Sequence, residues 1–210
     1  MGEATINVKL CGITREHDIR FALDLGIHWI GINVYPPSPR CVEFEAAEPL
    51  LAHIPPGKRV CVDVMPTVEK LQMCQHAGFD YFQVHIDADI DVSRVQAWTD
   101  LVGADRLWLA PKLAPGSAFP EQFLPYSDTF LLDAFSKHVY GGTGHTSDWG
   151  LFAKLRTTYK DKKWILAGGL NPDNLAAALA QTGAENIDVN SGVESAPGIK
   201  DAGKLHALFA

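Results

Sequence analysis

Residues 164–189 read WILAGGLNPDNLAAALAQTGAENIDV, and this stretch contains a complete strand, helix and strand. The apolar run Trp164–Gly168 predicts a strand, and Pro172–Gln181 has apolar residues at helical spacing after a favoured start signal. Gly183 follows the helix, where a left-handed residue is favoured, and Asn186–Val189 predicts the next strand. Two strands joined by a helix of this length predict a parallel βαβ unit.

The same alternation of β-branched runs and amphipathic segments extends along the rest of the chain. The other predicted strands are Ile6–Gly12, Trp29–Tyr35, Arg59–Val64, Tyr81–Ile86, Arg106–Leu113 and Thr129–Phe135. The other predicted helices are Arg15–Leu25, Phe44–His53, Thr67–Ala77, Val92–Val102, Trp149–Tyr159 and Lys200–Phe209, with a weak, proline-broken one near Phe119–Leu124. Eight strands that each precede a helix predict an α/β protein with a closed (β/α)8 barrel, the TIM barrel, as a single domain over residues 1–210. An open doubly wound sheet is the alternative, but no GxGxxG turn follows the first strand.

The composition fits a globular protein that binds a small molecule. The 210 residues are 47% hydrophobic and 20% charged, and no apolar run approaches the roughly 18 residues that span a membrane. The net charge of −7, with scattered basic residues, disfavours nucleic acid as a partner, because that binding needs clustered Lys and Arg. The N-terminus has no secretory pattern, so we expect a cytoplasmic protein. For its oligomeric state we expect either a monomer or a homodimer.

Function in a barrel of this kind collects where the strands end and the following loops begin. Glycine-rich segments lie at three such places, after the sixth, seventh and eighth strands. Glycine lets backbone N–H groups approach an anion closely, which predicts a phosphate site; each glycine pair taken alone is also compatible with an ordinary turn. The expected phosphate-binding residues are Gly142, Thr143, Gly144, Gly168, Gly169, Ser191 and Gly192.

Ionisable residues near strand ends are candidates for the chemistry. Cys11 shares its parity on the first strand with Lys9, so the two point to the same side and the ammonium would favour a thiolate. The alternative is a buried cysteine that acts as a small hydrophobe. Asp133 interrupts the apolar sixth strand, where a carboxylate is costly unless it is useful, paired or bonded to the loop. Arg40, in a proline-bracketed loop, is either a clamp for a carboxylate or a solvated surface residue.

The carboxylates in the run His85–Asp91 are spaced in a way that invites a metal-binding interpretation. A calcium loop that started at Asp87 would need glycine and glutamate where the chain has Val92 and Trp98. The four cysteines show neither a CxxC pair nor zinc-site spacing. We therefore expect no metal and no cofactor, and a polar loop that leads to a helix N-terminus.

Taken together, these segments resemble the phosphoribosylanthranilate isomerase family over nearly the whole chain. The most specific motifs are Lys-x-Cys-Gly-Ile-Thr, Gly-Gly-Thr-Gly and Ser-Gly-Val-Glu-x-x-Pro-Gly-x-Lys-Asp. The segments that carry the resemblance are, in chain order, Lys9–Thr14, Ser38-Pro39-Arg40, Gln83-Val84-His85, Leu131–Ala134, Gly141–Gly144 with Asp148-Trp149, Ala167–Asn174 and Asp188–Asp201.

The resemblance implies a cofactor-free Amadori rearrangement of N-(5-phosphoribosyl)anthranilate in tryptophan biosynthesis. It implies that Asp133 protonates the furanose ring oxygen as general acid and that the Cys11 thiolate removes the proton from C2 as general base. Arg40 would hold the anthranilate carboxylate, and the glycine loops would hold the phosphate. The further substrate-binding residues implied by the resemblance are Lys9, His85 and Asp188.

Three residues depart from the family pattern. Asp63 stands where a large apolar residue is expected, Ile86 where glycine is usual, and Ser147 where Phe usually precedes the Asp-Trp pair. We expect these changes to alter the walls of the anthranilate pocket.

Two other functions compete with this one. The first is that of a histidine-pathway phosphosugar isomerase, whose family pattern has two catalytic aspartates. This chain has Cys11 in place of the first-strand aspartate, which argues against that function. A non-catalytic phospholigand-binding barrel is disfavoured because both Cys11 and Asp133 are retained.

Overall fold

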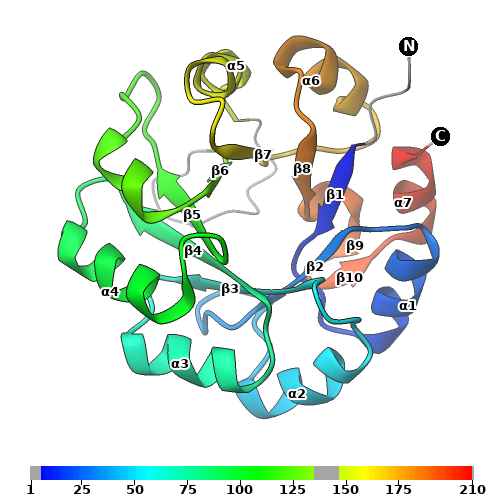
Figure 1. The fold of residues 1–210 in the computed structure, drawn as a ribbon. Helices are drawn as coiled ribbons and strands as arrows, with labels where there is room; N and C mark the ends of the chain where they lie inside the picture. The colour runs from blue at the N-terminus through cyan, green and yellow to red at the C-terminus, as the bar shows by residue number, and fades with distance from the viewer. Residues whose placement is uncertain (1–5, 135–146, 210) are drawn as a thin grey trace.

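The computed structural model describes residues 6–134 and 147–209, which form a closed barrel of eight parallel strands with helices on the outside (Figure 1). The barrel strands are β1 (Asn7–Leu10), β2 (Trp29–Asn33), β3 (Arg59–Val64), β4 (Tyr81–Asp87), β5 (Leu107–Lys112), β6 (Thr129–Leu132), β7 (Lys163–Leu166) and β8 (Asn186–Val189). The α-helices are α1 (Glu16–Asp24), α2 (Phe44–Ala52), α3 (Val68–His76), α4 (Val92–Val102), α5 (Trp149–Thr158), α6 (Leu175–Thr182) and α7 (Ala202–Leu208). Two 3-10 helices, η1 (Glu121–Tyr126) and η2 (Ser191–Val193), and a hairpin of β9 (Glu194–Ala196) and β10 (Ile199–Lys200) complete the described elements.

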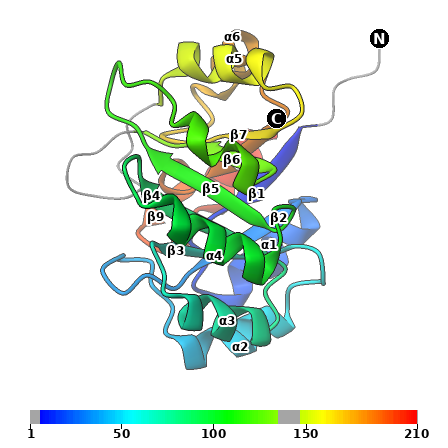
Figure 2. The same ribbon diagram turned by 60° about the vertical axis from the view of Figure 1, so that its left-hand side comes forward.

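The barrel closes between its first and last strands. Lys9 of β1 is in register with Trp29 of β2 on one side and with Asp188 of β8 on the other. Figure 2 shows α3 and α4 packed along the outside of the strands. The closed order β1 to β8 confirms the predicted α/β class and (β/α)8 barrel.

Alternate side chains of each strand face the barrel interior and the helices. On β3, Val60 and Val62 belong to a small apolar cluster inside the barrel. Cys61, between them in the sequence, packs instead in the larger core between the strands and the helices. This alternation decides which strand residues can reach a site inside the barrel.

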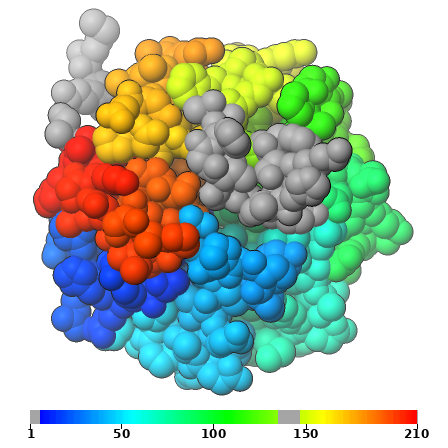
Figure 3. Space-filling model, turned by 180° about the vertical axis from the view of Figure 1, so that it is seen from behind, coloured from blue at the N-terminus to red at the C-terminus, as the bar shows by residue number. Residues whose placement is uncertain are grey.

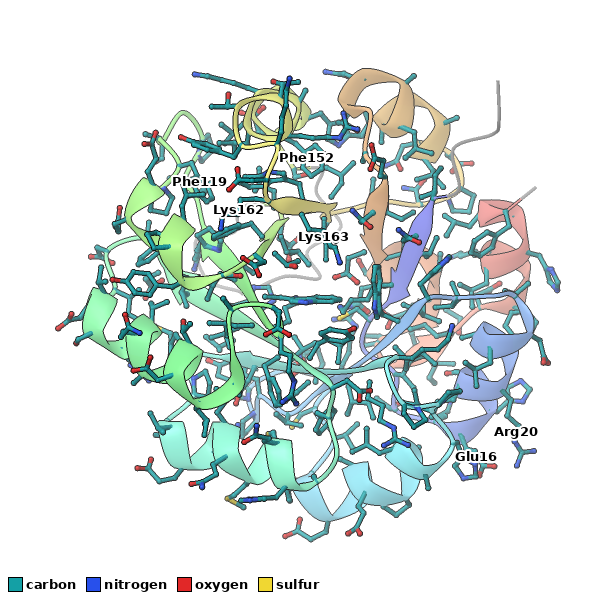
Figure 4. All side chains as sticks on the ribbon, in the orientation of Figure 1. Glu16, Arg20, Phe119, Phe152, Lys162 and Lys163 are labelled. Carbon is teal, nitrogen blue, oxygen red and sulfur yellow. The ribbon has the colours of Figure 1, made fainter. Side chains whose placement is uncertain are left out.

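Aromatic side chains fill the amino-terminal end of the barrel. The ring centroid of Trp108 lies 5.3 Å from that of Trp29 and 5.1 Å from that of Tyr81. Figure 4 looks onto this end, where Nζ of Lys163 lies 5.6 Å from the centroid of the Trp29 ring. The barrel is therefore packed at this end.

The helix ends follow the signals in the sequence. The side chains of Thr67 and Asp91 cap α3 and α4, accepting hydrogen bonds from backbone N–H groups at 3.2 and 2.9 Å. The acidic run after β4 thus leads to a helix N-terminus, as predicted. Gly183, expected after its helix, has positive φ, and so do Gly26, Gly78 and Gly103, which lie just past three other helices.

Some elements differ from the expectation. The weak helix predicted near Phe119–Leu124 is the 3-10 helix η1, which contains Pro125. The hairpin β9–β10 was not predicted, because its strands are only three and two residues long. Within the described ranges, no helix has the length and apolar content needed to cross a membrane.

Candidate active site

A cavity of about 260 Å³ opens where the barrel strands end. The predicted site residues that line it are Cys11, Arg40, His85, Asp133, Gly168, Gly169, Asp188, Ser191 and Gly192. Lys9, also predicted, is fully buried beside Asp188. The other three expected phosphate-binding residues, Gly142, Thr143 and Gly144, lie outside the described residues. Strands far apart in the sequence thus converge on one cavity, as a barrel requires.

The Lys9 ammonium forms an ion pair inside the barrel. Its Nζ lies 2.9 Å from Oδ1 of Asp188. Burial lowers the pKa of Lys9, but the charges of Asp188 and Cys11 raise it by more, so the ammonium form is favoured. Gly31 makes room for this group, because a Cβ there would lie 3.0 Å from Nζ of Lys9 and 3.2 Å from Sγ of Cys11. Sequence reasoning missed Gly31, although a glycine inside a strand often marks such a close approach.

The Cys11 thiol is buried, with 5% of the residue exposed, just after β1. Desolvation raises the pKa of this thiol, and the carboxylate of Asp188 raises it further. Lys9 and Lys200 lower the pKa, but by less, so it stays above the ordinary thiol value. Lys9 therefore acts in the predicted direction, and burial with Asp188 outweighs it in the ligand-free protein.

The Asp133 carboxyl group is half-buried at the end of β6. Desolvation raises its pKa to about 6, against a hydrogen bond from the Ala134 backbone N–H that favours the carboxylate. That hydrogen bond, to Oδ1 of Asp133, is 2.7 Å long. A carboxyl group with this pKa is partly protonated near neutral pH, so it can donate a proton.

His85 faces the cavity from β4 as a neutral imidazole. Burial, together with the charge of Lys9, lowers its pKa to about 4. Its Nε2 lies 3.1 Å from Nε2 of Gln83, which lines the same cavity. Both side chains are therefore suited to hydrogen bonding with a ligand, and His85 does not supply a positive charge.

Arg40 is buried and paired, unlike a solvated surface arginine. Its Nη2 lies 2.7 Å from Oε2 of Glu194, and its Nε lies 3.0 Å from Oε1. Glu194 belongs to the β9–β10 hairpin, and Figure 3 shows this orange-red segment beside the light-blue loop that contains Arg40. Sequence reasoning did not select Glu194, although it lies inside a specific motif.

The glycines after β7 and β8 permit close approaches between backbones. Gly168 has φ +88°, and a Cβ there would lie 2.5 Å from the backbone N of Ala134. A Cβ at Gly192 would overlap the carbonyl oxygen of Leu170. These glycines are needed for loop packing, and the same packing brings their backbones to the cavity wall.

None of the three departures from the family pattern lines this cavity, which corrects the expectation that they shape its walls. Asp63 points away from the barrel interior and pairs with Lys70, whose Nζ lies 2.7 Å from Oδ2. Ile86 packs in the core between the strands and the helices. Both have the outward parity of their strands. Ser147 donates a hydrogen bond of 2.7 Å to the carbonyl oxygen of Ala167 and lines a separate cavity next to Asp133.

No set of three or more His, Cys, Asp and Glu side chains converges as metal ligands within residues 6–134 and 147–209. The fold and the cavity define a (β/α)8-barrel enzyme with buried ionisable groups at the carboxyl ends of its strands. The family model described as N-(5'phosphoribosyl)anthranilate (PRA) isomerase matches residues 8–210. The chain belongs to this family, and it is an isomerase of tryptophan biosynthesis, as its motifs predict.

Individual relatives agree with the family match. The chain is 38% identical to the N-(5'-phosphoribosyl)anthranilate isomerase of Syntrophus aciditrophicus, over 97% of this chain and 85% of that protein. The crystal structure of the Thermus thermophilus enzyme has a TM-score of 0.82 and 32% identity, covering 97% of this chain and 96% of that one. A related isomerase at 26% identity and a TM-score of 0.75, covering 97% and 96% of the two chains, was solved with reduced 1-(o-carboxyphenylamino)-1-deoxyribulose 5-phosphate.

Proposed function

We propose that this chain converts N-(5'-phosphoribosyl)anthranilate to its ketose isomer with Asp133 as general acid and Cys11 as general base, without a metal or organic cofactor. The observation that carries the proposal is the pair of ionisable groups in one cavity. Asp133 and Cys11 enter it from β6 and β1, and the pKa of Asp133 is raised to about 6. Acid and base on separate strands can act on two different atoms of one small substrate.

The reaction divides between these two groups. Asp133 donates a proton to the furanose ring oxygen, the bond from C1 to that oxygen breaks, and a protonated Schiff base forms. The Cys11 thiolate then removes the proton from C2, and the electron pair of that C–H bond neutralises the Schiff base to give an enolamine. The enolamine tautomerises to the ketone. Cys11 then loses its proton to solvent and Asp133 takes one up, which restores the starting protonation states of both groups.

The raised pKa of Cys11 fits this order of events. Before ring opening, burial and Asp188 disfavour the thiolate. Ring opening creates a cationic nitrogen on C1, the carbon next to C2, and a positive charge near a thiol favours its ionised form. Cys11 therefore becomes an effective base only when the first step is complete, which keeps a reactive thiolate from persisting in the free protein.

The two ends of the substrate are recognised by different parts of the cavity. The backbones of Gly168, Gly169, Ser191 and Gly192 hold the phosphate, and Arg40 holds the anthranilate carboxylate. His85 and Asp188 contribute to substrate binding from inside the barrel. Lys9 contributes indirectly, through its ion pair with Asp188. The related isomerase solved with a carboxyl- and phosphate-bearing analogue supports this kind of ligand.

The direct test is an assay in which the unstable substrate is generated in situ and the loss of anthranilate-type fluorescence is followed with this protein alone. We expect turnover in the presence of excess chelator. No turnover by folded protein would favour the non-catalytic phospholigand-binding barrel. Activity that disappears on exhaustive chelation and returns with a divalent ion would overturn the cofactor-free mechanism.

A further inference from the structure

A buried network of three charged side chains borders the cavity. Glu194 accepts hydrogen bonds from Arg40, and its Oε1 also lies 2.7 Å from Nζ of Lys200. Lys200 is itself buried, and its Nζ lies 2.9 Å from Oδ1 of Asn190. The single carboxylate thus lies between two buried cations, and these cations hold its pKa below the usual value against the effect of burial.

The contact between Glu194 and Arg40 uses only one edge of the guanidinium. Nε and Nη2 form the side-on edge, and both donate to the carboxylate, at 3.0 and 2.7 Å. The other edge, made by Nη1 and the second hydrogen of Nη2, is the one that can meet a second carboxylate in a bidentate manner. Because Arg40 also lines the cavity, a ligand there can use this edge.

The surrounding chain keeps the Arg40 side chain in this place. Gly12 has φ +69°, and a Cβ at this residue would lie 2.6 Å from Cδ of Arg40 and 2.7 Å from Oδ1 of Asn190. The stem of Arg40 therefore crosses directly over the backbone that follows Cys11. This close approach fixes the stem, while Glu194 fixes the rotation of the guanidinium at its end.

We propose that Glu194 is a positioning residue that orients Arg40 for the carboxylate of the substrate. By taking the side-on edge, it presents the remaining edge to the cavity and ties the loop after β2 to the β9–β10 hairpin. Glu194 also separates Arg40 from Lys200, whose charges would otherwise repel in a buried setting. The proposal rests on the role of Arg40 given under the proposed function.

The test compares two ligands that differ only in the carboxyl group. One is reduced 1-(o-carboxyphenylamino)-1-deoxyribulose 5-phosphate, and the other is the same molecule without the carboxyl group. In Glu194→Gln we expect the affinity for the first to fall about tenfold or more, since a charge-assisted contact is misaligned. The affinity for the second should stay within about twofold, because its phosphate and sugar contacts are unchanged. In turnover, KM should rise while kcat changes little.

An equal loss for both ligands would show a merely structural role and overturn the proposal. Unchanged or tighter binding of the carboxyl-bearing ligand would also overturn it, because Glu194 would then compete with the ligand for Arg40. If Glu194→Gln does not fold, the selectivity between the two ligands is measured in Glu194→Asp instead. The aspartate side chain is one methylene shorter, so its carboxylate lies further from Arg40. Wild-type selectivity in that variant would contradict the proposal.

Two further variants separate the possible failures. Asp63→Asn removes another ion pair of a buried carboxylate, with the half-exposed Lys70, outside the cavity, and should keep wild-type selectivity. A loss of selectivity equal to that of Glu194→Gln would overturn the role of Glu194. Arg40→Ala should abolish selectivity for the carboxyl group. If it does not, the assigned role of Arg40 is wrong. If Arg40→Ala abolishes selectivity and Glu194→Gln does not, only the positioning role of Glu194 fails.

Discussion

Lys9 and Asp188 face each other in register on β1 and β8, and their side chains meet at 2.9 Å in the barrel interior. The pair neighbours the Cys11 thiol and acts on it with opposite signs. Asp188 raises the pKa of Cys11 and Lys9 lowers it. The ionisation of the proposed base therefore depends on how this pair is balanced.

Replacing Asp188 with Asn should lower the pKa of Cys11, because the variant keeps the ammonium of Lys9 and removes the opposing carboxylate. It should also destabilise the fold by about 3 kcal/mol or more, since it leaves a buried charge unpaired. The rate of iodoacetamide alkylation against pH measures the thiol pKa, and Cys11→Ala reports the background from Cys41, Cys61 and Cys74. An unchanged or higher alkylation midpoint in folded Asp188→Asn would contradict the assigned balance.

The pH dependence of kcat/KM should show that the general acid has a lower pKa than the general base. The reaction needs protonated Asp133, with a pKa of about 6, and ionised Cys11, with a pKa above the ordinary thiol value. The fraction of enzyme with both forms rises up to about pH 6, is constant between the two pKa values and falls beyond that of Cys11.

The substrate phosphate also titrates near pH 6, so binding of the reduced analogue over the same pH range separates its effect. The basic limb should coincide with the alkylation midpoint of Cys11. A kcat/KM that begins to fall at pH 6 would exclude this pair of assignments, because it would require a base with a lower pKa.

Asp133 should cost the protein stability at neutral and higher pH. Its folded pKa of about 6 is above the unfolded value, so its favourable contribution is present below about pH 4 and is lost as the pH rises through about 6. Asp133→Asn does not ionise and can keep the hydrogen bond from Ala134. Its free energy of unfolding should therefore exceed that of wild type by about 3 kcal/mol at pH 8, where the shift of about two pKa units counts in full, and come close to it at pH 4. Urea unfolding at the two pH values measures this, and a difference independent of pH would contradict the raised pKa.

Inorganic phosphate should inhibit competitively, because the loops after β7 and β8 supply backbone donors for a dianion. Gly169 has φ +62° and lines the cavity, so a branched side chain there both strains the backbone and fills the site. In Gly169→Val we expect a higher KM and weaker inhibition by phosphate. If both values stay at wild type in the folded variant, these glycines shape turns and do not bind phosphate.

The barrel could be predicted because its determinants are local. Each strand and helix has its own periodicity and end signals, so β3 and β8 were predicted with the bounds that the structure has. The closed order followed from repeating one βαβ unit. The short hairpin β9–β10 could not be predicted, because two- and three-residue strands carry no periodic signal.

The site could be predicted only as a set of residues. Position at strand ends correctly placed Cys11 and Asp133 in one cavity. The partner of Arg40 could not be found, because Glu194 lies 154 residues away and the pairing depends on the fold. The outward positions of Asp63 and Ile86 depend on strand parity, which follows once the inward residues Val62 and His85 are fixed.

The mechanism depends on Cys11 as the base and Asp133 as the acid, and kcat of the two single variants reports on both roles. Removing a positioned acid or base typically costs about 10²- to 10⁴-fold in rate, so Cys11→Ser and Asp133→Asn should each lose at least 100-fold in kcat. Binding of the reduced analogue should stay near wild type, and the double variant should be little worse than the worse single one. The decisive measurement is kcat of Cys11→Ser beside its thermal melt: we expect a folded protein with less than about a hundredth of wild-type turnover, and a folded variant that retains about a tenth or more would show that another residue is the base.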